Sequence, residues 1–296
     1  MLVLSAPVLL AGAISAQSMQ GANPQAAAAC SLPGLAPGRR PLSDHALLSA
    51  YNAQADAVKS VQASVLVRGQ SGAEYKVKPH GAQALPALLS FVAPEHLRLT
   101  GAVPFSGRRS FDLASDGREL RMLVPDGKLM RFLVGPADAP ATSKNPRENL
   151  RPGPLIDALH WTRATAQQPV IEHSEAEGHQ VLGIELATVQ GERARVDFDL
   201  ATGTVAGITM LDSKKQVVLD MHYGDWRTVL GSGDREGAVC FPRRMELTEP
   251  RQDLHVELKV ATLRVNVPIP PTQFRLLPPR GIPVTRLNLP AARKDR

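Results

Sequence analysis

Apolar and polar positions alternate with a period of two along most of the chain after residue 62. A strand with one buried face produces this pattern, because successive side chains point to opposite sides of a sheet. Turn sequences such as Ser115-Asp116-Gly117 and Ala201-Thr202-Gly203 separate many of these segments at intervals of roughly 8–12 residues. An antiparallel meander is therefore predicted. Its clearest alternating segments are residues 63–67, 97–99, 120–124, 196–200, 217–223 and 254–260.

Two segments show helical spacing instead. Residues 42–61 carry apolar side chains three and four positions apart, and Ser43 is placed to cap them. Residues 154–161 follow the proline-rich loop 136–152, and Pro154 suits a first helical turn. The predicted order is a helix, about six strands, a loop with a short helix, about six strands and a proline-rich tail.

One wide sheet with so few helices must curl to bury its apolar face. Small aliphatic side chains dominate that face, and aromatic residues make up only 4% of the chain. Such side chains fill a wide barrel poorly, which predicts a cavity or an apolar ligand. A β-sandwich would show the same alternation. The positions expected to line the cavity, or equally to form ordinary core, are Val65, Val67, Leu97, Leu99, Phe111, Leu113, Leu120, Met122, Phe198, Met210, Leu219, Met221, Met245, Leu247, Val256 and Leu258.

The N-terminal 29 residues are expected to be a leader. Residues 1–16 are apolar, uncharged and shorter than the ~20 residues of a membrane span, as in an export signal. Ala27-Ala28-Ala29-Cys30 resembles a lipobox, so we expect lipid on Cys30. A free thiol and a disulfide to Cys240 are the alternatives. The Pro/Gly-rich residues 30–41 predict a flexible tether.

The charge of the chain argues against nucleic-acid binding. Its 34 Lys and Arg against 28 Asp and Glu give a net charge of +6, part of it in the basic tail 286–296. The basic residues form no continuous block or stripe, and stacking aromatic residues are scarce. Weak attraction to an anionic membrane surface is the expected consequence.

No enzyme motif occurs in the sequence. The eight His are scattered, and no metalloprotease, nucleophile-elbow, phosphate-loop or dinucleotide pattern is present. His173 and His179 flank Glu175 and Glu177, but a solvated hairpin explains them better than a metal site. We therefore expect a binding protein with no catalytic residues, cofactor or metal.

Several motifs in the middle and at the end of the chain resemble the periplasmic lipoprotein carrier and acceptor superfamily, LolA and LolB. The resemblance covers residues 42–285 and includes a Pro-x-x-Leu-Arg strand, a Ser-Asp-Gly hairpin and a C-terminal Val-Asn, Ile-Pro, Phe, Pro-x-Gly pattern. The segments that carry it are residues 91–99, 111–117, 240–247, 263–270, 273–276 and 278–281.

This resemblance implies an incomplete antiparallel β-barrel of about 11 strands, wrapped over a few short helices, with an apolar cavity for acyl chains. With a lipobox, the chain looks more like the LolB-type acceptor, anchored at the periplasmic face of the outer membrane, than like a soluble periplasmic carrier. The implied partners are lipid or lipoprotein acyl chains, the membrane surface and a periplasmic lipoprotein carrier, with the protein itself a monomer. The alternatives are an envelope-stress regulatory module of the same fold and a structural lipoprotein that transfers no lipid.

Overall fold

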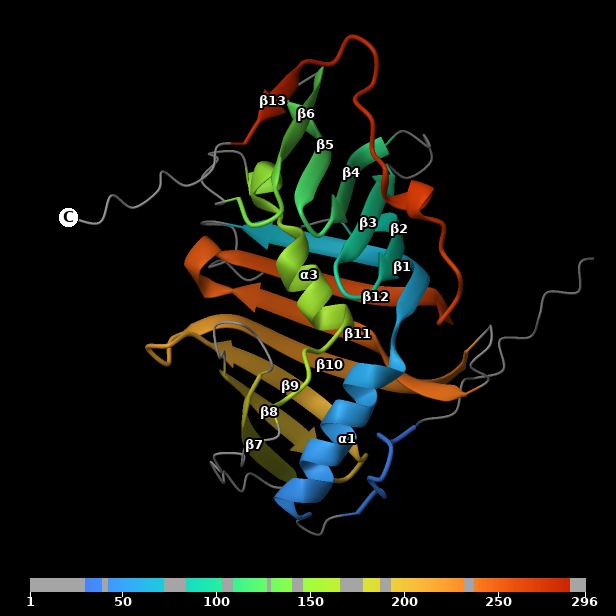
Figure 1. Ribbon diagram of the computed structural model, residues 1–296, viewed down its shortest axis with the longest axis vertical. Helices are drawn as coiled ribbons and strands as arrows, with labels where there is room; N and C mark the ends of the chain where they lie inside the picture. Colours follow the sequence, from blue (N-terminus) through green and yellow to red (C-terminus); the bar gives the residue numbers. More distant parts are fainter. Residues whose placement is uncertain are drawn as a thin grey trace, which may run out of the picture.

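The chain folds as a single large sheet with helices on one face, in the computed structural model shown in Figure 1. The structure describes residues 30–38, 42–71, 84–102, 109–126, 129–139, 146–165, 178–186, 193–231 and 237–287.

In the described part of the chain, six strands precede the second helix and form one half of the sheet. Each pairs antiparallel with the next along the chain, as the meander prediction requires. A row of apolar residues runs straight across this half, since Leu99 faces Leu113, Leu113 faces Met122 and Met122 faces Leu133. The strands are β1 (Ser60–Ser71), β2 (Leu85–Val92), β3 (His96–Ala102), β4 (Arg109–Asp116), β5 (Glu119–Asp126) and β6 (Leu129–Pro136).

The second half repeats this arrangement and joins the first through β1 and β12, which pair antiparallel. A second apolar row crosses this half, because Val67 faces Leu258, Leu258 faces Met245 and Met245 faces Tyr223. The strands are β7 (His179–Glu185), β8 (Arg193–Asp199), β9 (Thr204–Leu211), β10 (Val217–Leu230), β11 (Ala238–Glu249) and β12 (Leu254–Val265).

The sheet is open, with the order β13-β6-β5-β4-β3-β2-β1-β12-β11-β10-β9-β8-β7 among the described residues. It curls strongly, because α3 (Pro152–Leu159) contacts both β4 and β11 although four strands separate them. The predicted incomplete barrel over short helices is therefore confirmed, with thirteen described strands instead of about eleven. The sandwich alternative is wrong, because all of these strands share one sheet.

Both predicted helices are present with shifted ends. The first, α1 (Asp44–Ala57), begins after Ser43, whose hydroxyl accepts from the backbone N–H of Ala46 at 3.3 Å. It ends earlier than predicted because β1 begins at Ser60. The second helix, α3, begins two residues earlier than predicted. Figure 1 shows both helices against one face of the sheet. Short 3-10 helices occur at η1 (Pro146–Asn149), η2 (Pro250–Gln252) and η3 (Pro271–Phe274).

The proline-rich C-terminal segment packs on the opposite face of the sheet. Leu276 is buried there against Ala114, Leu123 and Phe132. The segment ends in β13 (Val284–Arg286), the one described strand that pairs in parallel, with β6. Arg286, assigned to the basic tail, thus belongs to the sheet, and residues 288–296 lie outside the described residues.

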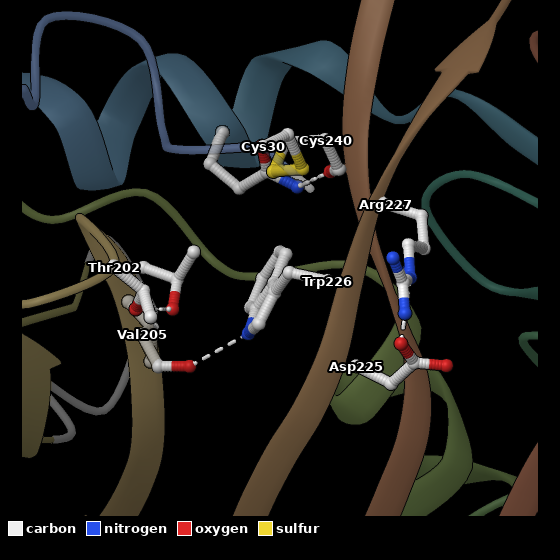
Figure 2. The surroundings of a disulfide bond; sticks show 9 residues. Cys30, Thr202, Val205, Asp225, Trp226, Arg227 and Cys240 are labelled. Carbon is white, nitrogen blue, oxygen red and sulfur yellow. Dashed lines mark hydrogen bonds and ion pairs between the residues drawn. A yellow bond between two sulfur atoms is a disulfide. The ribbon is translucent and has the colours of Figure 1, made fainter. Parts of the chain in front are cut away.

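Cys30 forms a disulfide with Cys240 of β11, with 5.8 Å between the Cα atoms (Figure 2). This is the alternative to lipidation that the sequence left open. A sulfur bonded to a second sulfur cannot also form a thioether to diacylglycerol, so the disulfide takes the place of the expected lipid on Cys30. The leader itself, residues 1–29, lies outside the described residues.

The segment that follows Cys30 is packed and does not form the predicted tether. Leu32 donates its backbone N–H to the carbonyl of Gly203 at 2.8 Å, and Gly38 donates to Leu200 at 2.9 Å. The Leu32 and Leu35 side chains are buried in the main core. Its Pro/Gly-rich composition predicted flexibility, but the disulfide and these two leucines fix residues 30–38 against the β8–β9 turn. Residues 39–41 lie outside the described residues.

Candidate functional site

All sixteen residues predicted to line the interior of the sheet lie in one apolar core. Fifteen of them are buried in a single cluster, and Phe111 packs against it half-buried. The cluster spans both halves of the sheet and includes residues of α1 and α3. These residues therefore lie on the buried face of nine of the described strands.

Four aromatic residues from distant parts of the chain meet at the centre of this core. Tyr51 of α1 stacks on Trp161, which follows α3, with ring centroids 5.3 Å apart. Trp161 also packs against Tyr223 and Trp226 of β10, at 5.6 and 6.1 Å. Both tryptophans of the chain and two of its three tyrosines are thus concentrated under the helices. The low number of aromatic residues in the sequence gives no sign of this cluster, because its members lie far apart along the chain.

The polar groups of this aromatic cluster are satisfied by hydrogen bonds. The Trp161 indole donates to the Tyr223 hydroxyl at 3.1 Å, and that hydroxyl donates to Sδ of Met221 at 3.4 Å. The Tyr51 hydroxyl donates to the backbone carbonyl of Thr162 at 2.8 Å. Burial raises the pKa of both tyrosines above the ordinary value. Both phenols therefore stay neutral and act as hydrogen-bonding groups, not as acids.

The fourth aromatic residue lies near the disulfide. The indole of Trp226 donates to the backbone carbonyl of Val205 at 3.0 Å (Figure 2). Cys240 is buried in the same core, and the half-buried Cys30 packs against it. The N-terminal segment and the aromatic cluster are therefore parts of one packed unit.

Three small clefts follow the seams between the helices and the sheet. Each has room for about one water molecule. Among the described residues, side chains of the helices and the aromatic cluster pack on the concave face in this conformation, and these three clefts are smaller than the predicted hollow. The lining residues of the first cleft are Leu150, Arg151, Pro154, Leu155, Leu219, Leu247, Glu249, Leu254 and Val256. The second is lined by Gln54, Ala55, Val58, Ala158, Leu159, Trp161, Phe241 and Pro242. The third is lined by Tyr51, Asp157, Trp161, Thr162, Leu186, Ile208, Met210 and Met221.

The first cleft is apolar except for one arginine and one carboxylate. Arg151 is buried and donates to the backbone carbonyls of Ala139 and Glu148, at 2.6 and 2.7 Å. Burial lowers the pKa of Arg151, and burial likewise raises that of Glu249. Through its hydrogen bonds to these two backbone carbonyls, Arg151 holds the chain in place at the start of α3.

The second cleft lies between α1 and α3 and contains a polar group without a partner. Gln54 is 5% exposed, and its amide nitrogen donates to the backbone carbonyl of Cys240 at 2.8 Å. Its amide oxygen has no hydrogen-bond partner. The remaining lining of this cleft is formed by apolar side chains.

The polar side chains considered as candidates lie elsewhere. Asp112 is fully buried and binds the guanidinium of Arg98 through both oxygens, at 2.9 and 3.1 Å. His179 contacts Asp197 at 2.9 Å, whereas residues 171–177, with the other members of the histidine–glutamate group, lie outside the described residues. In the part of the chain that is described, no three His, Cys, Asp or Glu side chains gather as metal ligands do.

Comparisons with known proteins rest on structure alone. No family model and no curated protein matches the sequence. Among the helices that the structure describes, none has both the length and the apolar character needed to cross a membrane.

Several solved structures align with most of this chain at low sequence identity. A LolA superfamily protein of Nitrosomonas europaea is 11% identical and aligns over 80% of this chain and 99% of its own, with a TM-score of 0.49. A domain of Vibrio parahaemolyticus described as an outer membrane lipoprotein-sorting protein is 10% identical over 78% and 94%, with a TM-score of 0.45. A chain of the Pseudomonas aeruginosa MucA/MucB complex aligns at 11% identity over 76% and 100%, with a TM-score of 0.19. The superfamily that the sequence motifs resemble is thus found again among the solved structures with which this fold aligns.

Proposed function

We propose that the protein binds acyl chains of lipids or lipoproteins between helices α1 and α3 and the concave face of the sheet. The observation that carries this proposal is the arrangement of the apolar face. One curled sheet presents a continuous apolar surface, and two short helices cover its centre with small clefts along their edges. The motif resemblance to lipoprotein carriers supports the same function.

Acyl chains must displace side chains to bind, because this conformation is closed. The buried residues of α3 are Pro152, Leu155, Ala158 and Leu159, all of them apolar. Apolar contacts are not directional, so an acyl chain can replace them against the sheet with little loss of buried surface. Each buried CH₂ group contributes about 0.8 kcal/mol, so a chain of ordinary length can offset the opening of the helix–sheet seam.

The disulfide supports a location in an oxidising compartment, which in bacteria is the cell envelope. It also favours a carrier in the periplasm over an acceptor anchored through Cys30, because that sulfur is already bonded. A LolB-like role at the outer membrane would require membrane attachment by other means.

The two tryptophans provide a direct test, because both lie in the aromatic cluster beneath the helices. Bromine quenches indole fluorescence on contact. Dibromostearic acid added to the delipidated protein is expected to quench the emission of Trp161 and Trp226, whereas stearic acid, the matched control, is expected to bind without quenching. Mass spectrometry of an organic extract of the freshly purified protein is expected to show co-purified lipid.

Absence of both quenching and co-purified lipid would overturn the proposal. Binding without quenching would show that lipid attaches elsewhere on the surface, and would contradict the site proposed here. Recovery of lipid-free protein in a stable complex with a periplasmic regulator would favour the envelope-stress alternative.

A further inference from the structure

The amide of Gln54 is held in one orientation by its surroundings. Its nitrogen lies 2.8 Å from the backbone carbonyl of Cys240, and a carbonyl can only accept a hydrogen bond. The opposite amide orientation would place two acceptor oxygens against each other. The donor half of the amide must therefore face Cys240, which leaves Oε1 as the unpaired atom of a side chain that lines the cleft between α1 and α3.

This acceptor is buried without a partner. Gln54 is 5% exposed, and Oε1 has no hydrogen bond. Leaving a buried polar group unpaired is costly, so such groups in native proteins call for an explanation. Ala55, Val58, Ala158 and Leu159, which line the same cleft, are all apolar.

We infer that Gln54 Oε1 accepts a hydrogen bond from the polar end of the bound amphiphile, and that the site selects ligands with an N–H or O–H donor next to the acyl chain. This inference rests on the proposed function and adds a chemical preference to it. The apolar surroundings hold the chain, and the oxygen of Gln54 fixes the position of its polar end. A ligand with only acceptors at that position leaves Oε1 unpaired and binds more weakly.

A pair of ligands that differ only in the donor tests this preference. N-methyldodecanamide has one N–H, whereas N,N-dimethyldodecanamide has none and carries the same chain. We expect the wild-type protein to bind the first roughly tenfold more tightly than the second, measured by competition with dibromostearic acid. Gln54→Met removes the acceptor at similar volume, so it is expected to bind both amides with equal affinity.

The variant Gln54→Glu tests whether a second acceptor at this position restores the preference for the N–H amide. A protonated carboxyl group can donate to the carbonyl of Cys240 and still present an oxygen to the cleft, and burial favours the protonated form. The preference for the N–H amide is therefore expected to return in this variant as the pH is lowered. If both variants fail to fold, the comparison of the two amides on the wild-type protein remains decisive.

The possible outcomes separate this inference from the proposed function. Equal binding of the two amides to the wild-type protein would overturn the role of Gln54, for example because a water molecule satisfies Oε1, and would leave acyl-chain binding intact. Failure of either amide to displace dibromostearic acid, together with absence of quenching by it, would overturn the proposed function itself. A preference that persists in Gln54→Met would assign the selectivity to another group and contradict the inference.

Discussion

The indole N–H of Trp161 donates to the hydroxyl of Tyr223 across 3.1 Å, linking the segment after α3 to strand β10. Both side chains are buried, at 6% and 8% exposed. This hydrogen bond fixes how the aromatic cluster packs beneath the helices, so the conformation of the candidate site depends on it.

Tyr223→Phe is expected to destabilise the protein by about 1–3 kcal/mol, because it leaves the Trp161 N–H buried without an acceptor. Urea unfolding followed by far-ultraviolet circular dichroism measures the change. Tyr51→Phe is the matched control. It removes a hydroxyl from the same cluster but leaves both indole hydrogen bonds in place, and its lost bond to Thr162 is only partly buried. Equal losses in the two variants would contradict this explanation.

The disulfide between Cys30 and Cys240 closes a separation of 210 residues in the sequence. Cross-links stabilise chiefly by restricting the unfolded chain, so reduction, or the double substitution Cys30→Ser/Cys240→Ser, is expected to cost about 2–4 kcal/mol. Thermal unfolding with and without reductant measures this. Release of residues 30–38 should also make them sensitive to limited proteolysis, read by mass spectrometry. An unchanged melting temperature after complete reduction would refute the prediction.

Asp112 and Arg98 form a buried ion pair on the outer face of β3 and β4. Arg98 also donates to the backbone carbonyl of Gln273, so the pair helps to hold the C-terminal segment on the sheet. Asp112→Ala leaves the guanidinium without its partner and is expected to cost about 3–5 kcal/mol. The control is Glu119→Ala, which breaks the half-exposed pair with Arg121 and is expected to cost less than about 1 kcal/mol. The free energy of unfolding of both variants, measured by chemical denaturation, is compared with that of the wild-type protein.

His160 follows α3 and packs against Phe91 with ring centroids 5.9 Å apart. Burial lowers the pKa of His160, and the nearby Lys59 lowers it further. The folded state therefore binds a proton less readily than the unfolded state, whose histidines titrate near 6.5. Because the unfolded state then binds more protons, stability is expected to fall as the pH drops below about 6.5.

His160→Gln removes this titration while keeping a polar side chain. The difference in unfolding free energy between the wild-type protein and the variant, measured between about pH 5 and 8, isolates the contribution of His160 from that of other groups. We expect this difference to shift in favour of the variant as the pH falls. A difference independent of pH would show that His160 does not titrate differently on unfolding.

The sequence predicted those features of the fold that depend on local pattern. The alternation around residues such as Leu120 and Met122 fixes which side of a strand is buried, whatever its neighbours are. The cap at Ser43 and the proline before α3 likewise act within one turn of a helix. One curled sheet follows from these local patterns together with the small number of helices, whereas β13 (Val284–Arg286) does not, because it lies in the proline-rich tail and has no alternating pattern.

The filled interior could not be predicted in the same way. Tyr51 and Trp161 belong to segments about a hundred residues apart, and neither segment shows that its ring will meet the other. The buried state of Asp112 depends on Arg98 from the neighbouring strand, and an acidic residue in an alternating strand ordinarily faces solvent. The sequence also does not show that the amide oxygen of Gln54 lacks a hydrogen-bond partner. The orientation of this amide is set by the backbone carbonyl of Cys240, which is far away in the sequence.

The cleft between α1 and α3 offers a last test of the proposed site. Ala55 and Ala158 line it from the two helices, and both are buried. Ala158→Leu places three further carbon atoms in this cleft. It is expected to weaken quenching by dibromostearic acid at least severalfold, because the added side chain occupies space that an entering acyl chain needs. Overpacking itself costs about 1–3 kcal/mol, so unfolding is measured alongside.

The matched control is Ile156→Leu, a change of equal volume at a half-buried position on the same helix. It is expected to leave both stability and quenching nearly unchanged. Reduced quenching in Ala158→Leu at preserved stability would mean that acyl chains enter between the helices. Unchanged quenching in a folded Ala158→Leu protein would place the chains in another seam, because a leucine in this cleft cannot coexist with a bound chain there.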